Sequence, residues 1–194
     1  MPDPRMSHEA RPIRIVLVED DVDDAELMRA CFADAGLRVE LERVESSPTF
    51  RAALVRGAVD LVMADYSLPR FDGIAVLELA RELRPDLPVV LISGAISENL
   101  AIETLRLGAT DYVLKQRLDR LVPVVLRALR ESEARRRTLE ELRELSREVR
   151  DCASTLATDT TEPRTDVSLA ALARLQTAIE QLETHFARAL GERR

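Results

Sequence analysis

The sequence has no tryptophan, and aromatic residues make up only 3% of its 194 residues. Proteins that bind single-stranded nucleic acid stack bases on aromatic side chains, so this scarcity argues against that class. A cationic excess is also missing, because 28 basic and 35 acidic side chains leave a formal charge of −7. Proteins that bind phosphate backbones or anionic membranes need a positive face. The composition therefore predicts neither nucleic acid nor membrane as a partner.

Cysteine is scarce as well, with only Cys31 and Cys152. Two cysteines build neither a disulfide framework nor a zinc site, and each is interpreted as a small buried hydrophobic residue. No apolar run approaches the ~20 residues of a membrane-spanning helix. Residues 1–12 contain proline and charge but no apolar segment, which argues against a secretory signal and predicts a flexible tail. We therefore expect a cytoplasmic protein.

Lysine is almost absent, since Lys115 is the only lysine among 28 basic residues. So complete a bias toward arginine indicates codon composition rather than function. Against that background, the one lysine marks a position where arginine is not tolerated, because a compact ammonium group differs from a planar guanidinium fork.

Short apolar runs alternate with helical patterns along the first two thirds of the chain. Hydrophobic residues make up 46% of the sequence, enough for a packed core. Strands are predicted over 13–18, 39–44, 60–64, 88–92 and 111–114. Helices are predicted over 22–35, 47–56, 73–83 and 97–107, and another begins near Leu118. This alternation predicts an α/β fold in which helices cover both faces of a five-stranded parallel sheet.

Polar residues follow the carboxyl ends of four predicted strands: Glu19, Asp20, Asp65, Ser93 and Lys115. Sheets of this kind bind ligands beyond those ends. Carboxylates packed together repel one another, so they need protons or a cation. Mg²⁺ takes carboxylate and carbonyl oxygens and accepts phosphate as a further ligand. A carboxylate in such a site can attack phosphorus to form an aspartyl phosphate, and a lysine and a hydroxyl can bind the remaining oxygens.

Four segments carry a resemblance to a known family: VEDD (18–21), MADYSLPRFDG (63–73), LISGA (91–95) and GATDYVLK (108–115). They resemble, in order and in distance, the signature segments of a bacterial response-regulator receiver domain of two-component systems. The resemblance covers residues 13–126. It implies a doubly wound, flavodoxin-like (βα)5 receiver domain.

The resemblance also implies roles for residues of the acidic site. Asp65 would be the phosphoacceptor. Asp20 would bind Mg²⁺ directly, Glu19 would act mainly through water, and the main-chain carbonyl of Ser67 would supply a further oxygen. Lys115 would pair with Asp65 before phosphorylation and with a phosphoryl oxygen afterwards.

A switch is implied in the same way. Ser93 would be the hydroxyl that moves to bond the phosphoryl group, and Tyr112 the aromatic residue that rotates inward behind it. Taken alone, Tyr112 fits a core position better; its place shortly before Lys115 favours the switch. One departure is Gln116, which stands where the family usually has proline. A non-proline cis bond costs ~2.5–4 kcal/mol, so we expect a trans bond, and the family's partner surface at this loop is not transferred.

Other acidic residues are interpreted as structural. Asp21 is expected to cap the helix that follows it, and Asp23 and Asp24 are expected to be favourable first-turn charges rather than metal ligands. Asp72 is expected to cap the helix that begins at Gly73.

Residues 127–194 are predicted to form a helical, coiled-coil extension, because no stop signal follows the helix that begins near Leu118. One apolar stripe comprises Leu142, Leu145, Val149, Cys152 and Leu156. After a polar connector over 157–166, a second helix over 167–190 has a matching stripe of Leu172, Leu175, Ile179, Leu182 and Phe186. The two stripes predict an antiparallel hairpin. Because two helices have little core, we expect a homodimer that completes a four-helix bundle.

The extension shows no pattern typical of a DNA-binding output. Acidic residues flank the triplet 135–137 (RRR), which indicates a solvated helix face. A phosphotransfer role for His185 is an alternative, but its surroundings (THFARAL) do not resemble a phosphotransfer box.

Three functions are compared. The favoured one is a phosphorelay response regulator without a substrate of its own. It would take its phosphoryl group from a sensor histidine kinase or a phosphotransfer protein and would signal through dimerisation or docking of the hairpin to a protein partner. The second is a Mg²⁺-dependent phosphatase-like enzyme whose Asp65 turns over external phosphoesters. Such an enzyme would need a dedicated acid or base, and no spare histidine lies near the site. The third is a constitutive scaffold with a non-switching receiver, against which the intact set of site residues argues.

Overall fold

The structure is a computed structural model that describes residues 11–68, 71–94, 104–158, 174 and 177. Its centre is a five-stranded sheet of β1 (Ile13–Val18), β2 (Val39–Val44), β3 (Leu61–Asp65), β4 (Val89–Ser93) and β5 (Asp111–Leu114). The strand order is β2-β1-β3-β4-β5, and every neighbouring pair is parallel. The predicted parallel α/β sheet is therefore confirmed, with strand bounds within one residue of those expected.

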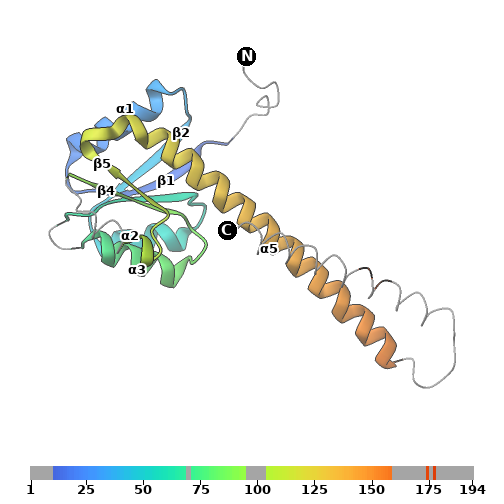
Figure 1. Ribbon diagram of the computed structural model, residues 1–194. Coiled ribbons are helices and arrows are strands. Elements are labelled where there is room, and N and C mark those ends of the chain that lie inside the picture. The colour runs from blue at the N-terminus through green and yellow to red at the C-terminus, as the bar shows by residue number, and fades with distance from the viewer. Residues whose placement is uncertain (1–10, 69–70, 95–103, 159–173, 175–176, 178–194) are drawn as a thin grey trace, which may run out of the picture. The chain divides into compact units, whose positions relative to one another are not determined.

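Helices cover both faces of the sheet (Figure 1). They are α1 (Val22–Asp34), α2 (Ser47–Arg56), α3 (Gly73–Leu83) and α5 (Leu121–Thr158), with a 3-10 helix over Lys115–Arg120 before α5. On one face Met28 and Phe32 of α1 and Val125 of α5 pack against the sheet. On the other, Phe50 of α2 and Leu77 of α3 do so. Because both faces are covered, β3 and β4 are buried along their whole length, which explains their continuous apolar sequence.

Short polar side chains begin three of the helices. Asp21 accepts hydrogen bonds from the amides of Asp23 and Asp24, and Asp72 accepts one from the amide of Ala75 at 2.8 Å. Both predicted caps are confirmed. Ser46 and Thr49 form a reciprocal capping box at the start of α2. These caps hold the loops after β1 and β3 against the helices that follow.

The chain divides into two compact units, residues 1–132 and 133–194, and α5 is continuous through the division. The predicted boundary between 126 and 127 stays a prediction. Within residues 141–150 of α5, the stripe residues Leu142, Leu145 and Val149 are less exposed than their neighbours, and Leu145 is buried. This agrees with the predicted apolar stripe as far as side chains are described there.

Several predictions fall on other parts of the chain. The tail over 1–10, most of the helix predicted over 97–107, the connector over 159–166, most of the second extension helix and His185 lie outside the described residues. Among the described residues, no helix combines the length and the apolar character needed to cross a membrane.

Candidate functional site

The carboxyl ends of the strands bring the predicted site residues to one edge of the sheet. β3 pairs with β4 so that Asp65 lies opposite Ile92, and β4 pairs with β5 so that Ser93 lies opposite Leu114. β1 ends beside β3, with Val18 opposite Ala64, and Glu19 follows directly. This register explains why residues far apart in sequence meet there.

Three carboxylates form a cluster at that edge. Glu19, Asp20 and Asp65 each offer an oxygen, and these atoms lie within 4.8 Å of one another. Glu19 is fully buried and Asp65 nearly so, whereas Asp20 is exposed. Two buried carboxylates and one at the surface form a donor set of the kind that a hard divalent cation prefers, with an open side for water or phosphate. The chemistry of this set fits Mg²⁺.

Lys115 is the cationic partner of the cluster. Its Nζ donates to Oδ2 of Asp65 at 2.7 Å and to Oε2 of Glu19 at 3.0 Å. The pairing between Lys115 and Asp65 that the resemblance implied is therefore present. A third bond from the same nitrogen goes to the carboxylate of Asp24 in the first turn of α1. An ammonium group has three donors, and all three are engaged here.

The contact between Asp24 and Lys115 was not predicted. Asp24 was interpreted only as a favourable charge in the first turn of a helix, and it does lie in that turn. No local pattern marked this contact, because Asp24 lies in α1 whereas Asp20 precedes the cap residue Asp21 and is not part of the helix. Asp24 is not part of the carboxylate cluster around Asp65.

Burial and charge act against each other at this site. Burial raises the pKa of Glu19, and the negative charge of Asp65 raises it further. Hydrogen bonds from the Asp21 amide and from Lys115 lower this pKa, but the net shift is upward. For Lys115, burial lowers the pKa, but hydrogen bonds to Asp24, Asp65 and Glu19 outweigh burial and raise it. Lys115 therefore stays charged, and a further cation at the cluster would favour the charged form of Glu19.

Both oxygens of Asp65 have donors. Oδ1 accepts the main-chain amide of Ser67 at 2.9 Å, and Oδ2 accepts Lys115. These bonds fix the orientation of the carboxylate at the end of β3. The role of the Ser67 carbonyl as a metal ligand stays a prediction.

Arg43 supports the loop that carries Glu19 and Asp20, and sequence analysis missed it. From β2, its guanidinium group donates to the carbonyl of Glu19 at 3.0 Å and to that of Asp20 at 3.2 Å. It also forms an ion pair with Glu45 at 2.6 Å. Arg43 is one of many arginines in this chain, so its residue type offered no signal.

The two predicted switch residues lie on neighbouring strands. Ser93 is fully buried at the end of β4, and Tyr112 on β5 is half-buried and packs against the core under α2 and α3. Gln116 donates a hydrogen bond from its side-chain amide to the carbonyl of Gly94, next to Ser93. The bond between Lys115 and Gln116 is trans, as predicted, since the described residues contain no cis peptide bond.

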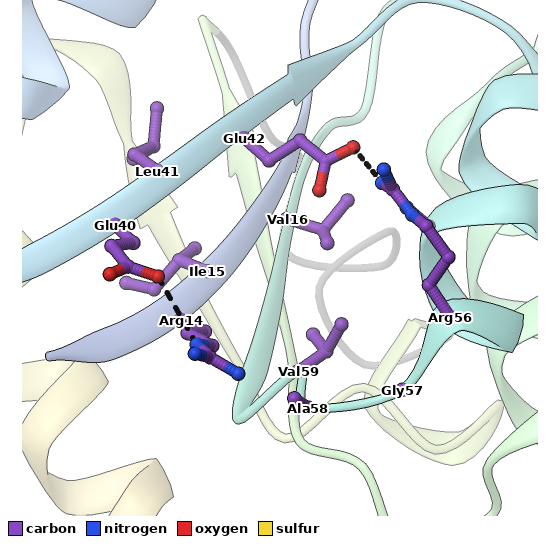
Figure 2. Close-up of a pocket in the computed structure, with 11 residues that line it drawn as sticks. Arg14, Ile15, Val16, Glu40, Leu41, Glu42, Arg56, Gly57, Ala58 and Val59 are labelled. Atoms are coloured by element: carbon purple, nitrogen blue, oxygen red, sulfur yellow. Dashed lines mark hydrogen bonds and ion pairs between the residues drawn. The ribbon is translucent and has the colours of Figure 1, made fainter. Parts of the chain in front are cut away.

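A pocket of about 470 Å³ lies at the other edge of the sheet, near the amino ends of β1 and β2 (Figure 2). Two ion pairs line it: Arg14 with Glu40 at 3.1 Å, and Arg56 with Glu42. Because these charged groups already neutralise one another, the pocket offers no unpaired charge to a ligand.

Comparison with known proteins agrees with this geometry. The family described as "Response regulator receiver domain" matches residues 15–126, a range that contains all residues of the acidic site. The transcriptional regulatory protein ZraR of Salmonella typhimurium strain LT2 is 32% identical over 118 residues, which cover 60% of this chain and 26% of that protein. The C4-dicarboxylate transport transcriptional regulatory protein DctD of Rhizobium meliloti is 31% identical over 134 residues, or 69% of this chain and 28% of that protein.

A solved structure shares the fold. The crystal structure of the receiver domain of NtrX from Brucella abortus aligns with a TM-score of 0.54 at 35% identity, covering 60% of this chain and 98% of that one. The chain thus spans nearly all of an isolated receiver domain but only about a quarter of the length of the two transcriptional regulators.

Proposed function

Since the chain belongs to the response-regulator receiver domain family, we propose that it is a two-component signalling protein that is phosphorylated on Asp65. The observation that carries this proposal is the contact of Lys115 with Asp65, at 2.7 Å, inside a cluster of three carboxylates. The phosphodonor is a sensor histidine kinase or a phosphotransfer protein, and the reaction takes place in the cytoplasm. The receiver acts on its own aspartate and not on a separate substrate.

Phosphorylation is a transfer between two side chains. A carboxylate oxygen of Asp65 bonds to the phosphorus of the donor phosphohistidine, the P–N bond breaks, and its electron pair leaves with the imidazole. Later, water attacks the aspartyl phosphate and releases inorganic phosphate, which restores the carboxylate. Glu19, Asp20, Asp65 and the Ser67 carbonyl would hold Mg²⁺, which when bound offsets the negative charge of the phosphoryl oxygens.

Lys115 and Ser93 act on the transferred group. The Lys115 ammonium group neutralises Asp65 before transfer and binds a phosphoryl oxygen afterwards. The Ser93 hydroxyl moves toward another phosphoryl oxygen, and Tyr112 turns inward beside it. Phosphorylation thereby shifts the equilibrium between two arrangements of the loops after β3 and β4.

The output passes through α5 to the helical extension. α5 begins with residues of the receiver core, Leu121 and Val125, and continues as the helix that carries Leu142, Leu145 and Val149. The extension pairs with a second copy of the chain or with a protein partner. Arg136 and Arg137 are paired with glutamates of the same helix, Glu140 at 3.7 Å and Glu133 at 2.6 Å, which supports a solvated face rather than a nucleic-acid contact.

The test is phosphorylation of the full chain by acetyl phosphate in the presence of Mg²⁺, followed by mass spectrometry. We expect a single added phosphoryl group on Asp65, and none on an Asp65→Asn variant. Size-exclusion chromatography with light scattering, with and without beryllofluoride, then measures whether the oligomeric state responds. An unmodified Asp65 in a folded protein would refute the phosphoacceptor assignment.

A further inference from the structure

Three carboxylates accept hydrogen bonds from the single ammonium group of Lys115. Its ammonium nitrogen donates to Glu19, Asp65 and Asp24, so no donor is left for a further oxygen. A phosphoryl group on Asp65 takes over the donor that Asp65 now accepts, and it gains a second donor only if Glu19 or Asp24 releases one. The other two carboxylates differ in exposure, and this difference sets which of them Lys115 can release at the lower cost.

Loss of the hydrogen bond from Lys115 would cost Glu19 and Asp24 different amounts of free energy. The side chain of Glu19 is fully buried, so a released Glu19 carboxylate would lie in the protein interior without its cation, which is costly. The side chain of Asp24 is 33% exposed, so water can solvate its carboxylate when Lys115 turns away. Asp24 is therefore the acceptor that Lys115 can give up at the lower cost.

Asp24 also adds negative charge beside the site without belonging to the carboxylate cluster of Glu19, Asp20 and Asp65. Its charge repels an incoming phosphoryl group and attracts the ammonium group toward α1. Both effects oppose the contact between Lys115 and the phosphoryl oxygens. We propose that Asp24 is a positioning residue that holds Lys115 toward α1 and competes with the phosphoryl group for its ammonium.

This inference rests on the proposed phosphorylation of Asp65. It predicts that loss of the Asp24 charge strengthens binding of a phosphoryl group. If Asp24 were instead needed to assemble the site, its loss would weaken that binding. The chain offers a matched control, because Asp23 lies in the same turn of α1, carries the same charge, is exposed and is not an acceptor of Lys115.

The experiment is a beryllofluoride titration of the full chain at saturating Mg²⁺, followed by fluorine NMR, for the wild type, Asp24→Asn and Asp23→Asn. We expect Asp24→Asn to bind beryllofluoride roughly two- to fivefold more tightly than Asp23→Asn, the range of a partly exposed ion pair. We also expect a lower half-saturating concentration of acetyl phosphate in single-turnover phosphorylation, with little change in the maximal rate constant. Thermal unfolding checks that all three proteins are folded.

The outcomes separate the two proposals. If the wild type binds no beryllofluoride, the proposed function is wrong. If the wild type binds it but the two variants have equal affinities, the effect is one of general charge, and only the role of Asp24 is refuted. Weaker binding by Asp24→Asn also refutes competition, because it would mean that Asp24 assembles the site.

Discussion

The ammonium nitrogen of Lys115 lies 2.7 Å from Oδ2 of Asp65, across 50 residues of sequence. Lys115 follows β5 and Asp65 ends β3, and these strands are separated by β4 in the sheet. The contact therefore depends on the parallel register of all three strands. It also places the only lysine of the chain where a compact cation has three carboxylates within reach.

A substitution of that lysine by arginine keeps the charge but changes its shape. A planar guanidinium group cannot place its donors where one ammonium nitrogen contacts three carboxylates. We expect Lys115→Arg to slow phosphorylation by acetyl phosphate roughly tenfold or more, because misplacement by about an ångström has effects of that size or larger. Radiolabel incorporation over time measures the rate. The reverse change at an exposed neighbour, Arg117→Lys, is the control, and equal rates for Lys115→Arg and the wild type would contradict the prediction.

The pKa of Glu19 is expected to respond to Asp65. Burial raises this pKa and the charge of Asp65 adds to the shift. Asp65→Asn should therefore lower the pKa of Glu19 toward the ordinary 4.5. A carboxyl group whose pKa is raised by folding stabilises the folded state below its unfolded pKa, and that contribution is lost as pH rises through the folded pKa. As pH rises from acidic to neutral, the contribution of Glu19 to the free energy of unfolding should therefore fall more in the wild type than in Asp65→Asn.

Two measurements check this pH dependence. Carbon-detected NMR titration follows the Glu19 carboxyl group, and urea unfolding at acidic and neutral pH gives the free energies. Asp23→Asn removes an equal charge outside the cluster and should leave the pKa of Glu19 unchanged. A pKa of Glu19 that stays the same or rises in Asp65→Asn would show that the charge of Asp65 does not act on Glu19 as described.

Much of this fold could be predicted from the sequence because local patterns and tertiary packing agree. Continuous apolar runs such as 61–64 and 89–92 predicted strands buried on both faces, and Asp21 and Asp72 stood at helix starts where short acceptors belong. The convergence of Asp65 and Lys115 followed from the rule that parallel strands present their carboxyl ends at one edge.

The contacts that were missed depend on side-chain directions that no local pattern sets. Whether Asp24 faces Lys115 or solvent depends on the rotation of α1 about its axis, which packing of Met28 and Phe32 against the sheet determines. Arg43 lies on an edge strand, and its contact with the carbonyls of Glu19 and Asp20 requires the loop after β1 to turn toward β2. Both contacts are tertiary and involve residue types that are common in this sequence.

The contact of Arg43 with the loop after β1 should contribute to stability. Replacement of Arg43 by alanine removes a charged donor from the carbonyls of Glu19 and Asp20, so we expect a loss of about 1–2 kcal/mol in the free energy of unfolding. Arg38→Ala removes the same charge from an exposed position and should cost much less. Urea unfolding followed by circular dichroism compares them. Equal losses in the two variants would mean that the hydrogen bonds of Arg43 add nothing measurable.

The proposed dimer depends on the apolar stripe of α5, and Leu145 is its most buried described residue at 8% exposure. Leu145→Asp places a carboxylate in that stripe, and burying it without a partner is costly, so we expect the dimer to weaken by about two orders of magnitude in dissociation constant.

Ser146→Asp adds the same charge one position away, where the side chain is exposed, and should leave the dimer unchanged. Light scattering across a concentration series measures both, while beryllofluoride binding reports that the receiver stays folded. A wild type that is monomeric at every concentration, or equal behaviour of the two variants, would contradict pairing through this stripe.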